Sequence, residues 1–127
     1  MKNTQSLKLN KDFRRVYRGK NIAGGYTVVY ACKNKYGFNR LGLTVSKSFG
    51  KATARNRVKR LMRESYRLME NTIRTGYDLI IVARHRAADK TQAQIQKDIG
   101  FVLKSMDLIE TAAERNKNNE NNTNSVD

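Results

Sequence analysis

Apolar residues recur at helical spacing in three segments of the chain. Phe13, Val16 and Tyr17 stand three and four positions apart, which predicts a short helix with Asn10 as its N-cap. A longer basic segment, expected to begin with Thr53 as its N-cap, and the last apolar stretch of the chain have the same period. The predicted helices therefore span residues 10–18, 53–71 and 91–109.

Three further segments are rich in β-branched and apolar residues and predict strands over residues 26–32, 41–46 and 77–83. The second alternates between apolar and polar positions, as a half-buried strand does, and we expect it to form a hairpin with the first. The third is an almost unbroken apolar run, which is typical of a central strand buried on both faces. This order of elements indicates an α+β fold, an α/β sandwich with helices packed on one sheet.

The chain has 127 residues and a formal net charge of +15, which indicates one domain with an anionic partner. Residues 110–127 contain six Asn and no aromatic residue, so we expect a disordered tail that cannot offset its ordering entropy by burial. Residues 1–109 form the predicted domain, whose 24 basic and 7 acidic residues give a net charge of +17. Nucleic acid and an anionic membrane are the candidate partners.

The sequence argues against membrane binding and secretion. No apolar run is long enough to span a bilayer, the first twenty residues lack the apolar core of a signal peptide, and there is no Trp to anchor at an interface. The single cysteine, Cys32, excludes an intrachain disulfide and a cysteine-based zinc site. We therefore expect a protein of the reducing cytoplasm.

The densest basic segment, residues 47–67, contains eight basic residues and one acidic residue. On a helical wheel its apolar side chains lie around Val58, and its charged side chains form a ridge on the other side. Like charges four residues apart destabilise an isolated helix, so a phosphate-binding surface explains this ridge better than an ordinary solvated face. Lys47 and Lys51 add to it, because backbone N–H groups at a helix start favour anions. The ridge comprises Lys59, Arg60, Arg63 and Arg67 with Asn56, flanked by Arg55 and Arg57.

Aromatic residues interleaved with basic ones suggest a second surface. Phe13 and Tyr17 lie one turn apart on the first predicted helix, and Tyr26 and Tyr30 share one face of the first predicted strand. If helix and strand line one groove, bases of a single strand could stack there while Lys and Arg hold phosphates. The alternative is that these aromatic residues belong to the ordinary core.

The sequence contains no recognisable catalytic constellation. His85 is the only histidine, and the acidic residues of the domain are scattered singly among the predicted elements. The glycines match no phosphate-binding loop. We therefore expect a binding protein with no catalytic residue and no metal site of its own.

Residues 54–60, ARNRVKR, resemble the signature of the bacterial ribonuclease P protein family, an Arg-Asn-Arg segment and a basic pair that open a long helix. Three other segments are similar to the family in the same order: KDF with VY in the first helix, LGLTVSK in the strand before the signature, and DLIIVAR in the last strand. The resemblance covers roughly residues 7–108. Where the family often has a proline after the last strand, this chain has His85-Arg86-Ala87, which changes only a loop.

This resemblance implies both a fold and a function. The fold is a sandwich on a mixed four-stranded sheet with an unusual left-handed βαβ crossover, similar to a ribosomal-protein domain. The protein would join a catalytic RNA, which holds Mg²⁺ and removes the 5′ leader of precursor tRNA, while the polypeptide itself binds no cofactor. The residues carried over to the catalytic RNA are Arg55, Asn56, Arg57, Lys59, Arg60 and Arg63, with Lys47 and Lys51 as plausible phosphate contacts. Those carried over to the leader groove are Phe13, Tyr17 and Tyr30.

Two other hypotheses fit the charge of the chain. A structural rRNA-binding protein of the ribosome would explain the charge and the fold equally well, but not the aromatic groove. A general single-strand binder or RNA chaperone is the third hypothesis. The leading hypothesis predicts neither a DNA partner nor a membrane partner.

Overall fold

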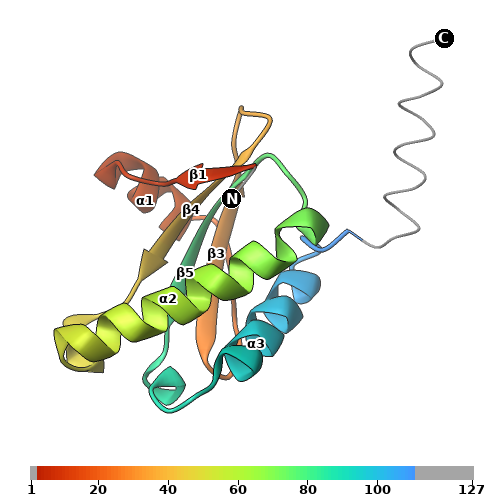
Figure 1. The fold of residues 1–127 in the computed structure, drawn as a ribbon. Helices are drawn as coiled ribbons and strands as arrows, with labels where there is room; N and C mark the ends of the chain where they lie inside the picture. Colours follow the sequence, from red (N-terminus) through yellow and green to blue (C-terminus); the bar gives the residue numbers. More distant parts are fainter. Residues whose placement is uncertain (1–2, 111–127) are drawn as a thin grey trace, which may run out of the picture.

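A five-stranded sheet organises the computed structural model, which describes residues 3–110 (Figure 1). Its strands are β1 (Thr4–Ser6), β2 (Lys20–Ala23), β3 (Thr27–Lys33), β4 (Asn39–Thr44) and β5 (Tyr77–Ala83). Its helices are α1 (Asn10–Tyr17), α2 (Ala52–Met69) and α3 (Gln92–Ser105), with 3₁₀ turns η1 (Lys47–Phe49), η2 (Glu70–Thr72) and η3 (His85–Ala87). The predicted tail, apart from Glu110, lies outside the described residues.

β5 is the central strand of the sheet, whose order is β1-β4-β5-β3-β2. It is parallel to β4 and antiparallel to β3, while β1 is parallel to β4 and β2 is antiparallel to β3. The predicted central strand is therefore confirmed, but the predicted hairpin is wrong, because β5 lies between β3 and β4. The sheet has five strands, whereas the family resemblance implies four and the sequence pattern predicts three. The pattern misses the short edge strand β1 and the antiparallel β2 because they carry few apolar residues.

The helix α2 connects two parallel neighbours in the sheet, β4 and β5. In Figure 1 both strands run downward, β5 lies to the right of β4, and α2 crosses in front of them. This is the left-handed crossover expected from the family resemblance, and it is opposite to the usual hand of βαβ units.

Helices cover both faces of the sheet (Figure 1). α2 and α3 pack on one face, where Val58 and Met62 of α2 and Ile95 and Ile99 of α3 are fully buried. α1 packs on the other face through a smaller cluster that includes its own Val16. The sheet is thus the middle layer of an α/β sandwich with a large and a small core.

Each helix begins within one residue of its predicted span, but α3 ends at Ser105, four residues before its predicted end, and two of the expected caps are wrong. Leu9 and Lys51, not Asn10 and Thr53, are the N-caps of α1 and α2, and neither caps its helix with a side-chain hydrogen bond. α3 instead begins with a capping box between Thr91 and the third residue of the helix. The first N–H groups of α2 therefore have no side-chain acceptor from the N-cap residue.

Candidate nucleic-acid interface

The basic surface of α2 is exposed because the opposite face of the helix is fixed against the sheet. Val58, Met62 and Tyr66 are fully buried. Arg60 and Arg63 lie on the exposed face. This division confirms the two-faced helix that the sequence predicts, although Tyr66 was not among the residues expected in the core.

The basic side chains of α2 differ in how firmly other groups hold them. Arg67 donates two hydrogen bonds to the Glu64 carboxylate, at 3.0 and 2.5 Å, and these bonds lower the pKa of Glu64. Arg57 reaches the carbonyl oxygens of Ala88 and Lys90 at 3.4 and 3.2 Å. Three cations of α2 have no such partner within the described part of the chain, and we call them the open ridge: Lys59, Arg60 and Arg63.

The other predicted phosphate contacts surround the start of α2. Lys47 in η1 and Lys51 before the helix are both exposed, as is Asn56 in the second turn. Arg55 is half-buried, and its guanidinium lies 3.4 Å from the carbonyl oxygen of Gly50. The structure therefore gathers these predicted residues at one end of the ridge, with Arg55 partly occupied in holding the preceding turn.

The predicted groove residues meet on the opposite face of the sheet. The ring centroids of Phe13 and Tyr17 are 6.5 Å apart, and those of Tyr17 and Tyr30 are 4.8 Å apart in an edge-to-face arrangement. Tyr17 is 39% exposed, and its hydroxyl lies 3.5 Å from Thr44 Oγ1. The three rings therefore form one cluster in which Tyr17 is open to solvent.

Tyr26 does not belong to this cluster, contrary to the sequence interpretation. It precedes β3 and packs against the larger core beneath α2 and α3, and the Lys90 ammonium lies 5.1 Å from its ring centroid. Alternation along the strand puts Tyr30 on the α1 face and its neighbours Val29 and Ala31 on the other. Tyr26 does not follow the period of two because β3 begins only at Thr27.

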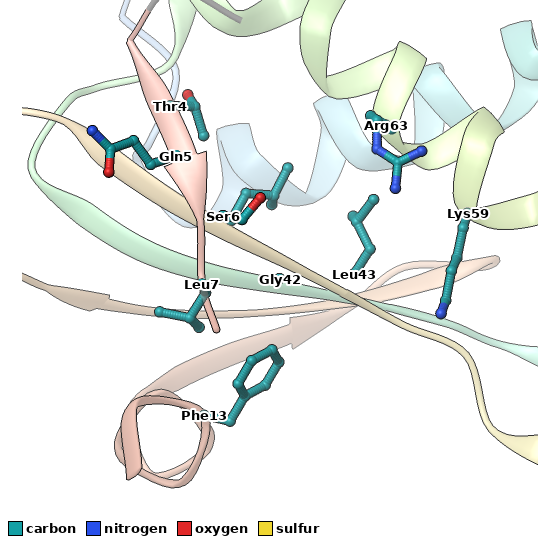
Figure 2. Close-up of a pocket in the computed structure, with 10 residues that line it drawn as sticks. Thr4, Gln5, Ser6, Leu7, Phe13, Gly42, Leu43, Lys59 and Arg63 are labelled. Atoms are coloured by element: carbon teal, nitrogen blue, oxygen red, sulfur yellow. The ribbon is translucent and has the colours of Figure 1, made fainter. Parts of the chain in front are cut away.

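A pocket of about 220 Å³ joins the two surfaces at the edge of β4 (Figure 2). β1 pairs with β4 only as far as Leu41, so the rest of β4 has no strand beside it on that edge. Figure 2 shows Phe13 reaching this edge from α1, with Lys59 and Arg63 extending toward it from α2. An aromatic ring and two cations of the open ridge therefore line the same pocket.

Gly42 gives Phe13 the room to reach the pocket, a role that the sequence analysis did not find. A Cβ at this buried position would lie 2.7 and 2.8 Å from two atoms of the Phe13 ring. Such a contact is well inside van der Waals separation. A glycine at a buried position of a half-buried strand is the signal that could have indicated a close approach.

An ion-pair network at the start of β5 was not predicted from the sequence. The fully buried Asp78 carboxylate accepts hydrogen bonds from Arg40, from Arg15 and from Asn34, and Asp12 completes the network beside Arg40 at 3.3 Å. Burial raises the pKa of Asp78, but these hydrogen bonds outweigh it and leave the pKa below its ordinary value. The charge of Asp78 is therefore neutralised within the protein.

Residues 3–110 contain neither a group of metal-binding side chains nor a membrane-spanning helix. Over this range no three His, Cys, Asp or Glu residues are grouped closely enough to hold a metal ion. The ring of His85 is engaged by Ser48, whose Oγ lies 3.1 Å from Nε2. None of the described helices is long and apolar enough to cross a bilayer.

Comparisons with known proteins identify the family of the chain. Residues 1–107 match the family model described as Ribonuclease P. The ribonuclease P protein component of Alkaliphilus oremlandii is 45% identical over 113 residues, which cover 88% of this chain and 99% of that protein. The corresponding protein of Clostridioides difficile is 45% identical over 107 residues, covering 83% and 94%.

Solved structures give the same result. The RNase P protein of Staphylococcus aureus superposes with a TM-score of 0.76 at 39% identity, covering 83% of this chain and 97% of that one. The RNase P protein of Thermotoga maritima superposes with a TM-score of 0.73 at 31% identity, covering 80% and 96%. These comparisons do not favour the ribosomal-protein hypothesis. The chain belongs to the ribonuclease P protein family.

Proposed function

We propose that this chain is the protein component of a ribonuclease P ribonucleoprotein and supports removal of the 5′ leader from precursor tRNA. Family membership supports the subunit role. The observation that carries the finer proposal is the pocket at the β4 edge, where Phe13 faces Lys59 and Arg63. In this proposal the aromatic cluster binds the single-stranded leader, and the α2 surface binds the catalytic RNA.

The basic surface of α2 suits a structured RNA. Its cations are spaced along a rigid helix, and each phosphate that they neutralise releases counterions. Three to six such contacts correspond to a slope of roughly −3 to −5 in a plot of log affinity against log salt concentration. The residues assigned to this role are Arg55, Asn56, Arg57, Lys59, Arg60 and Arg63, with Lys47 and Lys51 at the start of the helix.

The aromatic cluster suits a single strand. Base–aromatic stacking contributes about 1–3 kcal/mol per base and tolerates any sequence, because every base has a π-face. Tyr17 offers an exposed ring, and Phe13 and Tyr30 support it from either side. A leader held here would continue into the pocket at the β4 edge, where Lys59 and Arg63 can meet its phosphates.

The polypeptide in this proposal binds and orients RNA and takes no part in breaking the phosphodiester bond. The catalytic RNA holds the Mg²⁺ ions that hydrolysis requires, and the protein binds no cofactor. The basic protein lowers the electrostatic repulsion between two polyanions and adds contacts that only a leader-bearing substrate can make. We therefore expect the protein to increase cleavage most at low Mg²⁺ concentration, where few Mg²⁺ ions screen the repulsion between the two RNAs.

Reconstitution tests the proposed function. The protein is mixed with its cognate catalytic RNA and a precursor tRNA at low Mg²⁺, and release of the 5′ leader is measured with and without protein. We expect the protein to increase the cleavage rate. Absence of stimulation, with the catalytic RNA active at high Mg²⁺, would refute the subunit role.

Two kinds of variant test the division between the surfaces. Arg60→Glu should weaken assembly with the catalytic RNA, whereas Lys104→Glu, the same charge change on the exposed face of α3, should not. Tyr17→Ala should weaken binding of precursor tRNA to the holoenzyme by about 5- to 150-fold, the equivalent of one lost stacking contact, and should spare mature tRNA. Equal losses for both tRNAs would contradict the groove assignment.

A further inference from the structure

A second basic pocket lies on the other side of α1 from the aromatic cluster. It has a volume of about 410 Å³ and opens between α1 and the loop that connects β3 to β4. Its lining shares no residue with the open ridge or the aromatic cluster. The residues that line it are Asp12, Arg15, Lys33, Asn34, Lys35, Tyr36 and Arg40.

The loop that carries this pocket is held in one conformation by Asn34. The Asn34 side chain donates to the carbonyl oxygen of Phe38 at 3.1 Å and to the Asp78 carboxylate at 2.9 Å. Its amide oxygen accepts from the backbone N–H of Tyr36 at 2.9 Å, and its own N–H donates to Gly76 at 2.9 Å. These four hydrogen bonds therefore fix the backbone that carries Lys33 and Lys35, the residues on either side of Asn34.

Aromatic packing fixes the other wall of the pocket. The rings of Tyr36 and Phe38 stack with centroids 5.2 Å apart and planes inclined by 19°. The Arg40 guanidinium lies 4.8 Å from the Tyr36 ring centroid while it also binds Asp78. Arg40 is thus held from both sides and cannot move far to meet a ligand.

The charges of the pocket do not cancel. Arg15 and Arg40 are matched by the carboxylates of Asp12 and Asp78, which form ion pairs with both. Lys33 and Lys35 are exposed, and neither takes part in an ion pair within the described part of the chain. The pocket therefore has a net charge of +2, carried by Lys33 at the end of β3 and Lys35 in the loop that follows, while the paired Arg15 lies at its rim with a side chain that is 41% exposed.

The strand register places this pocket close to the proposed path of the RNA. On the α1 face of the sheet, the cross-strand pair Arg40–Asp78 lies at the pocket, and the pair Thr44–Val82 lies beside Tyr17. Only one cross-strand pair on this face separates them, and it lies under α1. The outer surface of α1 is exposed and basic at positions 11, 14 and 18. A polyanion that leaves the aromatic cluster over α1 therefore meets positive charge all the way to the second pocket.

We propose that this pocket binds a backbone phosphate of single-stranded RNA through Lys33, Lys35 and Arg15. The inference rests on the proposed function and extends it from two RNA surfaces to three. A phosphodiester is the ligand class, because the pocket combines excess positive charge with the exposed ammonium groups of Lys33 and Lys35. The strand can come from a long 5′ leader or from the catalytic RNA, and experiment distinguishes the two.

The test uses Lys33→Gln/Lys35→Gln, with Lys97→Gln/Lys104→Gln on α3 as the control of equal charge change. All four side chains are exposed, so thermal unfolding of both variants should match the wild type. Holoenzyme affinity for precursor tRNAs with leaders of graded length, and protein affinity for the catalytic RNA alone, are measured from 50 to 200 mM salt. Loss of two single-strand phosphate contacts should reduce the salt slope by roughly 1.4, so the affinity of the wild type should fall about sevenfold more than that of the variant over this range.

Each result decides the proposal. A reduced slope that appears only with longer leaders assigns the pocket to the leader, and one that appears with the catalytic RNA alone assigns it to that RNA. A slope unchanged for both RNAs, or changed equally by the α3 control, overturns the proposal. If the wild type also fails to stimulate cleavage, the proposed function fails instead, so the two failures are distinguishable.

Discussion

Replacing Gly42 with Ala should disable the proposed leader surface without substituting any residue that we propose to contact RNA. The new Cβ would lie 2.7 Å from Phe13 Cζ and 2.8 Å from Cε1, whereas ordinary contacts between carbon atoms are about 3.5–4.0 Å. The Phe13 ring must therefore move by about an ångström. Ile80, at 3.6 Å, is already in ordinary contact and need not move.

The magnitude follows from what Phe13 contributes. If it stacks on one base of the leader, its loss costs about 1–3 kcal/mol, and Gly42→Ala should reduce affinity for precursor tRNA by up to the same 5- to 150-fold. The effect on stability should be smaller. Gly42 has no positive φ angle, so alanine loses nothing in backbone conformation and gains about 0.4–1 kcal/mol by restricting the unfolded chain.

A double-mutant cycle separates this mechanism from general disruption. Holoenzyme affinity for precursor and mature tRNA is measured for Gly42→Ala, Phe13→Ala and the double variant, with urea unfolding as the control for stability. If Gly42 acts through Phe13, the double variant should bind precursor tRNA no more weakly than Phe13→Ala alone. Fully additive losses, or equal losses for mature tRNA, would refute the reasoning.

Three further predictions concern stability. Asp78→Asn should lower the free energy of unfolding in urea by about 2–3 kcal/mol, below the ~3–5 kcal/mol of a fully buried pair because Arg15 is 41% exposed. Since the folded-state pKa of Asp78 is depressed, its contribution is present above about pH 4 and lost as pH falls through the depressed pKa, so parallel wild-type and variant curves in acid would contradict it. Tyr66→Phe removes a buried hydroxyl that lies 3.0 Å from Thr4 Oγ1, and thermal unfolding should show a loss of about 1 kcal/mol. Gly24→Ala would place a Cβ 2.6 Å from a carboxylate oxygen of α3, and urea unfolding should show a loss of about 1–3 kcal/mol, in contrast to the open position Gly37.

The sequence predicts those helices and strands whose hydrophobic pattern extends over many consecutive residues. The apolar run of β5 and the two faces of α2 each carry their own signal, and both are confirmed. Strand pairing is a tertiary property, so the distance between β3 and β4 along the chain does not reveal that β5 lies between them. β1 and β2 were missed because strands of three and four residues with mostly polar side chains have no period to detect.

The same distinction applies to the candidate interface. The open ridge is visible in the sequence because its residues belong to one helix. The ion-pair network is different, because Asp78 lies 63 positions from Arg15 and 38 positions from Arg40 along the chain. No local sequence pattern connects residues so far apart. The available signal was Asp78 itself, a charged residue at the start of an apolar central strand. A buried carboxylate requires hydrogen-bond or ion-pair partners.

The two cores differ in size, so the helices on the two faces of the sheet are held by different amounts of buried apolar contact. α1 has eight residues and is held by the small cluster of Leu7, Val16 and Ile80 and by the ion pairs of Arg15, whereas α2 and α3 share the large core. Local opening follows the density of buried apolar contacts, so amide hydrogens of α1 should exchange with solvent at a lower free energy than those of β5 or α2. The helix beside the proposed leader groove would then be the part of the fold that becomes most ordered when RNA binds, and part of the binding free energy would offset the entropy cost of ordering it.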